Sequence, residues 1–240
     1  MTALLAAMPH RPLLVSEIFG PTVQGEGPST GRQALFIRLS RCNLTCGRCD
    51  TPYTWDWSRF DAAEQTQKIS GEELVAWALG HPTRLVVISG GEPLIQQQLL
   101  DPVVRALAAA GREVEIETNG TFAPTTAVAG AVTAFNVSPK LASFAPSDDE
   151  PRRIVGAALK ALEATGKARF KFVVSDPADL QEVASLQREF GLTEIWIMPE
   201  GAKPEQVIAR TRQIADEVIE RGWNLSTRLH VLVWGDTRGR

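Results

Sequence analysis

Three cysteines form the most reactive cluster in the sequence. Cys42, Cys46 and Cys49 are the only cysteines of the 240-residue chain and follow the spacing Cys-x3-Cys-x2-Cys. An odd number in one cluster fits no complete disulfide framework and favours a reducing compartment. Closed zinc and iron–sulfur sites take four protein ligands, so three thiolates would leave one coordination position free for chemistry. A structural zinc site and three merely buried thiols are the alternatives.

Composition and charge exclude several classes of protein. Hydrophobic residues make up 44% and charged residues 22%, which rules out wholesale disorder. The 25 basic and 28 acidic residues leave no basic stripe of the kind that nucleic-acid binders carry. No apolar run reaches the roughly 18 residues of a membrane span, and no targeting signal is evident. We therefore expect a cytoplasmic protein with no direct nucleic-acid or membrane partner.

A regular alternation of strands and helices must position the cysteines. After a first strand at 13–19, the pattern predicts strands at 34–40, 84–90, 113–120, 134–140, 168–175, 194–201 and 225–233. Helices are expected at 70–79, 96–110, 124–130, 151–165, 176–190 and 203–221, two of them with start signals at Ser70 (a capping box) and Asp176-Pro177. Such alternation gives parallel βα units. A full barrel needs eight, so we predict an α/β fold: a partial, open (β/α)6-like barrel with an N-terminal strand and hairpin extension. Residues 1–12 are expected to be a flexible tail and 13–240 a single domain.

Polar and glycine-rich segments end the predicted strands. In parallel α/β folds these ends meet at one edge of the sheet, where active sites lie. The segments are the cysteine loop, SGGEP (89–93), ETNG (117–120), SPK (138–140) and MPEG (198–201). Each alone could be a turn, but together they predict a site. Without a Cβ atom, Gly90 and Gly91 could let the backbone approach a ligand closely; a simple strand-to-helix turn is the alternative.

The cysteine spacing and the GGEP segment resemble those of radical S-adenosylmethionine enzymes. Three further features, TVQGEG (22–27), Asp50-Thr51 after Cys49, and ETNG with SPK, resemble the 7-carboxy-7-deazaguanine synthase family over about residues 14–201. The resemblance implies a radical-SAM partial barrel with a [4Fe–4S] cluster on Cys42, Cys46 and Cys49, whose fourth iron chelates S-adenosylmethionine. Reduction of the cofactor would yield a 5′-deoxyadenosyl radical that abstracts hydrogen from the substrate.

The same resemblance implies a reaction. The enzyme would be a carbon–nitrogen lyase of the queuosine and 7-deazapurine pathway. It would convert 6-carboxy-5,6,7,8-tetrahydropterin to 7-carboxy-7-deazaguanine with loss of ammonia, and it would use Mg²⁺. Flavodoxin or ferredoxin are natural reductants, and a homodimer is expected.

Site residues follow from the matching motifs. Thr51 would give its hydroxyl oxygen to Mg²⁺, as a hard cation prefers. The residues implied for S-adenosylmethionine are Arg48, Cys49, Asp50, Gly90, Gly91, Glu92, Ser138, Pro139, Lys140, Met198, Pro199, Glu200 and Gly201. Those implied for the pterin are Val23, Gln24, Gly25, Glu26, Arg38, Ser89, Glu117, Asn119 and His230.

Several of these residues have simpler interpretations. Arg38 could form a salt bridge with Glu17 or Glu26 instead of binding a substrate carboxylate, since a buried arginine needs a partner. Thr51 could cap the next turn, and Glu117 could pair with a lysine. Lys140 could be solvated and His230 structural. Arg48 stands where the family often has an aromatic residue, so stacking on the adenine is an open question.

Three other functions remain as alternatives. An activating enzyme that places a radical on a partner protein would share the cysteine triplet but would need no carboxylate-bound Mg²⁺. A non-enzymatic metal-binding module would explain the cysteines but not the other motifs at the same edge. Modification of tRNA itself fits the pathway but not the charge balance.

Overall fold

The computed structural model describes residues 11–144 and 151–240. The expected flexible tail at 1–12 lies almost entirely outside the described residues. The strands are β1 Leu13–Val23, β2 Gln33–Leu39, β3 Gln67–Ile69, β4 Leu85–Gly90, β5 Glu113–Thr118, β6 Ala134–Val137, β7 Ala168–Val174, β8 Ile195–Pro199 and β9 Asn224–Leu225. The α-helices are α2 Ala62–Gln65, α3 Gly71–Leu79, α4 Gln97–Ala109, α5 Thr126–Ala131, α6 Gly156–Glu163, α7 Asp179–Phe190, α8 Pro204–Glu220 and α9 Leu229–Trp234. Short 3-10 helices occupy η1 Gly27–Ser29, η2 Pro52–Thr54 and η3 Pro93–Gln96.

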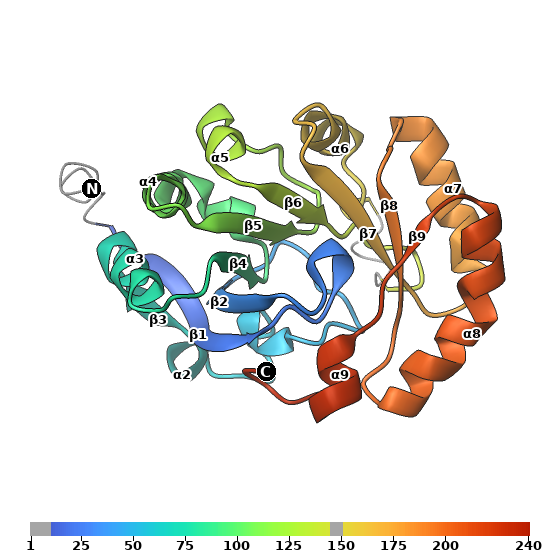
Figure 1. Cartoon of the computed structure of the whole chain (residues 1–240), viewed down its shortest axis with the longest axis horizontal. Coiled ribbons are helices and arrows are strands. Elements are labelled where there is room, and N and C mark those ends of the chain that lie inside the picture. The colour runs from blue at the N-terminus through green and yellow to red at the C-terminus, as the bar shows by residue number, and fades with distance from the viewer. Residues whose placement is uncertain (1–10, 145–150) are drawn as a thin grey trace.

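The strands form one curved sheet in the order β3-β1-β2-β4-β5-β6-β7-β8-β9. Strand β1 is antiparallel to β2 and β3, and every pair from β2 to β9 is parallel. The two edge strands, β3 and β9, do not pair with each other, so the barrel is open as predicted. Helices α3 to α8 follow the outer side of the arc, whereas α9 lies on its open side (Figure 1).

Alternation along each strand separates an apolar outer face from a polar inner face. On β5, Val114 and Ile116 belong to the core that packs against the outer helices, whereas Glu115 and Glu117 lie on the other face. The outer helices supply matching stripes, as α4 does with Leu100, Val103, Val104 and Leu107. The inner face of the arc is thus where polar side chains accumulate.

Three sequence predictions about local structure are wrong, the first being the helix expected at 151–165, which begins only at Gly156 as α6. The last strand is predicted at 225–233, but β9 ends at Leu225 and α9 begins at Leu229, which places His230 on a helix. A short apolar run such as LHVLVW has no periodicity that separates a strand from a helix. Helix α7 begins at Asp179 rather than after Asp176, whose carboxylate instead accepts a bond from Ala178 N (2.8 Å) within a turn.

Short edge elements were missed. Strand β3 pairs with the beginning of β1 through three residues, a length that carries no readable alternation. None of the helices in residues 11–144 and 151–240 is long and apolar enough to span a membrane.

The capping box predicted for α3 is present, and its contribution can be measured. Ser70 Oγ accepts from Glu73 N (3.2 Å) and the Glu73 carboxylate accepts from Ser70 N (2.9 Å). We expect Ser70→Ala to lower the free energy of unfolding by about 1 kcal/mol, because the first turn loses an acceptor. Urea titration followed by circular dichroism measures it.

Ser185→Ala is the matched control. Its hydroxyl donates to Gln181 O (3.0 Å) on the exposed side of α7, and its loss should change stability by less than about 0.5 kcal/mol. Equal effects of the two variants would contradict the assigned role of Ser70.

Candidate active site

A cavity of about 800 Å³ opens at the carboxyl edge of the sheet. Its volume suits a nucleoside-sized cofactor together with a small heterocycle. The predicted site residues that line it are Val23, Gln24, Gly25, Glu26, Arg38, Cys42, Cys46, Arg48, Cys49, Asp50, Thr51, Ser89, Gly90, Gly91, Glu117, Asn119, Ser138, Lys140, Met198, Glu200 and His230. Glu92, Pro139, Pro199 and Gly201 do not line it, so their direct contact with a cofactor stays a prediction.

The cysteine loop follows β2 and faces this cavity. None of the three cysteines forms a disulfide; Cys46 is buried, and Cys42 and Cys49 are half-buried. Cys42 Sγ accepts from Leu44 N (3.5 Å) and lies 3.9 Å from Asn119 Nδ2. Burial raises the pKa of the Cys42 thiol to about 12, so a thiolate there requires a compensating metal charge.

The donor set fits an iron–sulfur cluster. In a four-iron cluster each thiolate binds a different iron, so the thiolates need not surround a single ion. Three cavity-facing thiols on one short loop, with an N–H group directed at one sulfur, fit this arrangement.

The two glycines of GGEP serve a backbone contact. A Cβ atom on Gly91 would lie 2.1 Å from Arg41 O, and one on Gly90, which has φ +142°, would lie 2.2 Å from Leu39 O. Gly91 N donates to Leu39 O (3.1 Å) and Glu92 N to Arg41 O (2.8 Å). Arg41 itself adopts a left-handed φ of 80° just before Cys42. The glycines thus allow a close approach to the start of the cysteine loop, and their approach to a ligand in the cavity stays a prediction.

Glu92 does not line the cavity but supports two turns that border it. Its carboxylate is fully buried and accepts from Leu94 N (2.8 Å), Thr118 Oγ1 (2.8 Å) and Asn119 N (2.7 Å). Burial raises its pKa to about 7, although these hydrogen bonds oppose the shift. Glu92 therefore joins the GGEP turn to the ETNG turn, which orients both.

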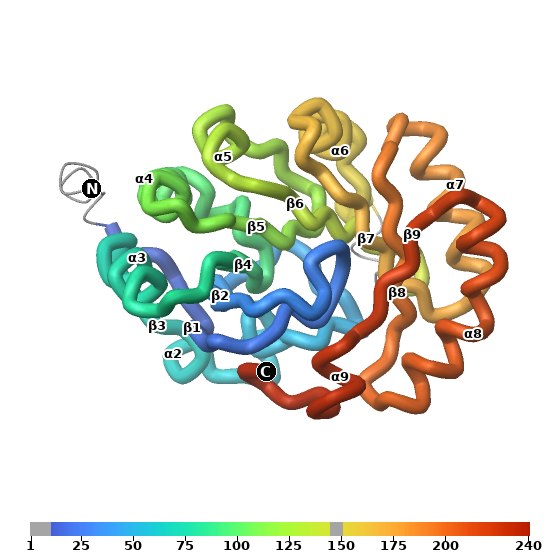
Figure 2. Tube along the Cα trace, in the orientation of Figure 1, coloured from blue at the N-terminus to red at the C-terminus, as the bar shows by residue number. Residues whose placement is uncertain are grey.

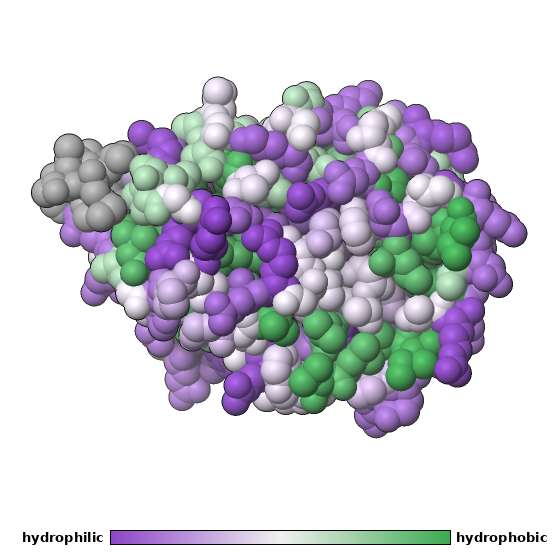
Figure 3. Space-filling model, in the orientation of Figure 1, coloured by the Kyte–Doolittle hydropathy of each residue, from purple (hydrophilic) through white to green (hydrophobic). Residues whose placement is uncertain are grey.

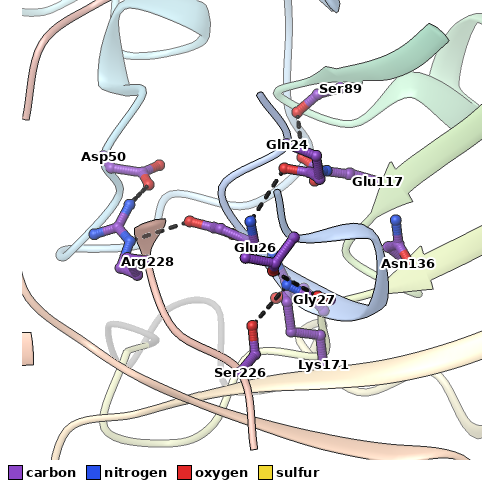
Figure 4. Close-up of polar contacts among 12 residues, drawn as sticks. Gln24, Glu26, Gly27, Asp50, Ser89, Glu117, Asn136, Lys171, Ser226 and Arg228 are labelled. Atoms are coloured by element: carbon purple, nitrogen blue, oxygen red, sulfur yellow. Dashed lines mark hydrogen bonds and ion pairs between the residues drawn. The ribbon is translucent and has the colours of Figure 1, made fainter. Parts of the chain in front are cut away.

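Predicted substrate residues from three strands or loops meet on the inner face. Glu117 accepts from Ser89 Oγ (2.8 Å) and from Gln24 Nε2 (3.1 Å), as Figure 4 shows. The alternative was that Glu117 pairs with a lysine. Lys171, which also lines the cavity, instead forms its ion pair with Glu26. A cluster of amide, hydroxyl and carboxylate groups in one wall can read the edge of a flat heterocycle.

Glu26 is the centre of a buried ionic network. It pairs with Lys171 and with Arg228 (3.1 Å), and His230 Nε2 lies 3.9 Å away. Burial opposes its ionisation, but Lys171 and Arg228 hold its pKa well below the usual range. Burial lowers the pKa of His230, which favours the neutral imidazole. The expected acceptance of substrate hydrogen bonds by Glu26 stays a prediction, since two cations already engage this carboxylate.

Sequence reasoning missed Lys171 and Arg228. Lys171 had a readable signal, because a lysine in ARFKFVV breaks the apolar run at a position that shares a face with Arg169 and Val173. Arg228 had none: it follows a two-residue strand and lies 202 positions from Glu26.

Arg38 forms the salt bridge weighed as its simpler interpretation. Its Nε donates to Glu17 Oε1 (2.7 Å), which also accepts from the Tyr53 hydroxyl (2.8 Å). Burial opposes ionisation of Glu17, but Arg38 and Arg238 keep its pKa low. Arg38 also lines the cavity, so binding of a substrate carboxylate by its other donors stays a prediction.

The neighbours of the cysteines decide one of the open questions, and stacking of Arg48 on the adenine stays a prediction. Thr51 makes no side-chain cap on η2, and its hydroxyl lies 3.7 Å from Cys49 Sγ. The capping alternative for Thr51 is therefore wrong. The Arg48 guanidinium lies over the Phe144 ring, 5.6 Å from its centroid, and Lys140 donates to Ser138 Oγ (3.0 Å).

Comparison with known proteins assigns the family. Residues 36–140 match the Radical SAM superfamily. The chain is 38% identical to the 7-carboxy-7-deazaguanine synthase of Pyrobaculum aerophilum, over 94% of this chain and 96% of that protein. The chain belongs to the 7-carboxy-7-deazaguanine synthase family. The synthase of Hyperthermus butylicus is 35% identical over 92% of both chains. The crystal structure of QueE from Escherichia coli superposes with a TM-score of 0.68 at 28% identity, covering 91% of this chain and 95% of that one.

Family membership confirms the fold and the chemistry predicted from the motifs. The chain is a radical S-adenosylmethionine enzyme with a [4Fe–4S] cluster, built on an open α/β barrel. The roles of the individual site residues stay predictions, and the structure shows which of them line one cavity.

The glycine contact beneath the cysteine loop generates a test. We expect Gly91→Ala to lower the free energy of unfolding by about 1–3 kcal/mol and to reduce cluster loading, because the new methyl group displaces Arg41 and Cys42. Iron and labile sulfide per chain after anaerobic reconstitution, together with thermal unfolding, measure the effect.

Gly130→Ala is the control for this substitution. Gly130 lies in α5, and a Cβ atom added to it would have no neighbour within 4 Å, so the variant should load iron normally and gain up to about 1 kcal/mol. Normal iron content in Gly91→Ala would show that the glycine contact is not needed for cluster assembly.

Proposed function

We propose that this chain converts 6-carboxy-5,6,7,8-tetrahydropterin to 7-carboxy-7-deazaguanine with loss of ammonia; its relatives are named for this product. The observation that carries the proposal is that the cysteine loop and the Gln24–Ser89–Glu117 cluster open onto the same cavity. A radical generated at the cysteines would thus arise beside a wall suited to a flat, hydrogen-bonding heterocycle.

Each wall of the cavity has a distinct task. Cys42, Cys46 and Cys49 would hold the cluster, which with S-adenosylmethionine supplies a radical that abstracts a hydrogen atom from the substrate. Gln24, Ser89 and Glu117 would bind the edge of the pterin ring. Arg38, held by Glu17 on one side, would bind the substrate carboxylate with its free donors. The aromatic side chains of Phe19, Phe36, Trp55 and Phe144 also line the cavity and exclude water from the reacting centre.

Magnesium would bind beside the cluster. Thr51 lines the cavity between Asp50 and Pro52, and its hydroxyl is not used as a helix cap. An uncharged oxygen ligand suits Mg²⁺ when the substrate carboxylate and waters complete the shell.

We expect Thr51→Ala to retain the cluster while the Mg²⁺ concentration for half-maximal activity rises about tenfold or more, since a lost contact at a metal site typically weakens binding 10- to 100-fold. Steady-state rates over a Mg²⁺ titration measure it. Thr51→Ser, which keeps the hydroxyl, should behave like the unmodified enzyme. An unchanged Mg²⁺ response in Thr51→Ala would make Thr51 a structural residue only.

The partners of the enzyme belong to the proposal as well. Flavodoxin or ferredoxin would supply the electron. A homodimer is favoured by apolar side chains that gather over α9 and the adjoining end of α8 (Figure 3), where Val233 and Trp234 of α9 are 56% and 38% exposed. Three cysteines that form no disulfide suit a reducing compartment such as the cytoplasm.

One anaerobic assay tests the function directly. Cluster-loaded protein is mixed with reductant, Mg²⁺, S-adenosylmethionine and 6-carboxytetrahydropterin, and the products are identified by mass spectrometry. We expect 7-carboxy-7-deazaguanine, and we expect Cys46→Ala to lose both the cluster and the product. Formation of 5′-deoxyadenosine without the deazaguanine would refute the substrate and favour an activating enzyme. Neither product from fully loaded protein would refute the proposed reaction.

A further inference from the structure

One arginine joins three segments of the site. Arg228 lies between β9 and α9, and its side chain is 8% exposed. Its Nε donates to Glu26 Oε1 (3.1 Å), its Nη1 to Gly201 O (2.8 Å) and its Nη2 to Asp50 Oδ2 (2.6 Å). Figure 4 shows the guanidinium between the Asp50 and Glu26 carboxylates. The three acceptors are far apart in sequence, and all belong to segments that border the cavity.

The two carboxylates that Arg228 holds stand next to the residues of the proposed chemistry. Asp50 lies between Cys49, a cluster ligand, and Thr51, the proposed Mg²⁺ ligand. Glu26 follows Gln24 and Gly25 in the loop that borders the substrate side, and the Gln24 side chain reaches Glu117 (3.1 Å). A single guanidinium thereby connects the metal side of the cavity to its substrate side.

Arg228 is itself fixed by the backbone around it. Ser226 Oγ accepts from Gly27 N (2.7 Å), and Leu229 N donates to Gly25 O (2.8 Å). A Cβ atom on Gly25 would lie 2.0 Å from His230 Nδ1, so this loop fits the segment only with a glycine. Residues 226–230 therefore dock along the loop that contains Glu26, and Arg228 reaches across from there to Asp50.

We propose that Arg228 is a positioning residue that couples the Asp50–Thr51 turn to the Glu26 loop, so that cofactor cleavage is followed by reaction of the substrate. The proposal rests on the proposed function, because it assigns Thr51 to the metal and the Glu26 loop to the pterin. Arg228 acts through Asp50 and Glu26 and does not contact the reacting atoms itself.

The geometry requires an arginine. Three acceptors in three directions match the fork of N–H groups on a planar guanidinium, whereas a lysine offers one nitrogen. Arg228→Lys keeps a positive charge beside Glu26, which Lys171 also neutralises, so the buried carboxylate stays paired. Asp50 is 51% exposed and would turn to water once released. The substitution therefore breaks the contact with Asp50 on the metal side of the cavity and leaves Glu26 paired with cations.

The test compares Arg228→Lys, Asp50→Asn, the double variant and the unmodified enzyme, all cluster-loaded. Arg221→Lys is the matched control, because Arg221 pairs with Glu217 (2.6 Å) within α8, away from the cavity. Hydrogen–deuterium exchange of residues 24–32 and 47–55 reports loop order and needs no substrate. The ratio of released 5′-deoxyadenosine to 7-carboxy-7-deazaguanine reports coupling, which loss of folded protein alone would not change.

We expect Arg228→Lys to keep its iron and to speed hydrogen–deuterium exchange in both segments. The ratio of 5′-deoxyadenosine to 7-carboxy-7-deazaguanine should rise about tenfold, which is the equivalent of one lost charge-assisted hydrogen bond. Asp50→Asn should speed exchange in 47–55 and raise the ratio similarly. The double variant should add nothing to the ratio, since both changes break the same contact. Arg221→Lys should match the unmodified enzyme.

Two outcomes would overturn the proposal. In the first, Arg228→Lys leaves both the hydrogen–deuterium exchange rates and the product ratio unchanged. In the second, the double variant raises the product ratio by the combined effect of the two single variants. If Arg228→Lys loads no iron or unfolds, the half-exposed Asp50→Asn variant decides, and a normal ratio there refutes the coupling. If the unmodified enzyme forms no 7-carboxy-7-deazaguanine, the proposed function is refuted instead. The hydrogen–deuterium exchange rates would then still test whether Arg228 orders the two loops.

Discussion

The burial of one carboxylate organises the site. The Glu26 side chain is only 15% exposed, and an ionised group in that position is stable only with cationic partners. Lys171 comes from the middle of β7 and Arg228 from the segment before α9, so satisfying this charge brings together residues from both ends of the chain. The loop that carries Gln24 and Gly25 acquires its position from the same pairing.

A second constraint places the cysteines. The cysteine loop follows β2 with little regular structure of its own, and it is held where its first residues meet the GGEP turn of β4. Two glycines permit this contact, and Glu92 ties the turn to ETNG on β5. Three neighbouring parallel strands, β2, β4 and β5, thus share one rigid edge, on which the thiols are presented to the cavity.

Much of this arrangement could be predicted from the sequence, for identifiable reasons. The apolar runs of β4 to β8 and the helices between them have strong local patterns, and the capping box at Ser70 marks the start of α3. The cysteine spacing and the strand-end motifs are likewise local. The rest depends on contacts between distant residues: Arg228 reaches Asp50 and Glu26 across 178 and 202 positions, and no nearby residue signals either contact. Arg38 was ambiguous because its two interpretations are compatible: the side chain pairs with Glu17 and also borders the cavity.

The open side of the barrel is closed by side chains instead of strand pairing. Strand β9 ends after two residues, and the C-terminal segment runs through α9 back toward β1 and α2 (Figure 2). There Arg238 donates to Glu17 (2.9 Å) and Gln65 (2.9 Å), and its guanidinium stacks 3.9 Å from the Tyr53 ring centroid. A half-exposed ion pair of this kind contributes only about 0–1 kcal/mol, much less than a continuous ladder of backbone hydrogen bonds. The wall formed by residues 236–240 is therefore held to β1 and α2 mainly by side-chain contacts, each of which contributes little to stability. Arg228, ten residues before Arg238, is instead held by three hydrogen bonds in a buried position.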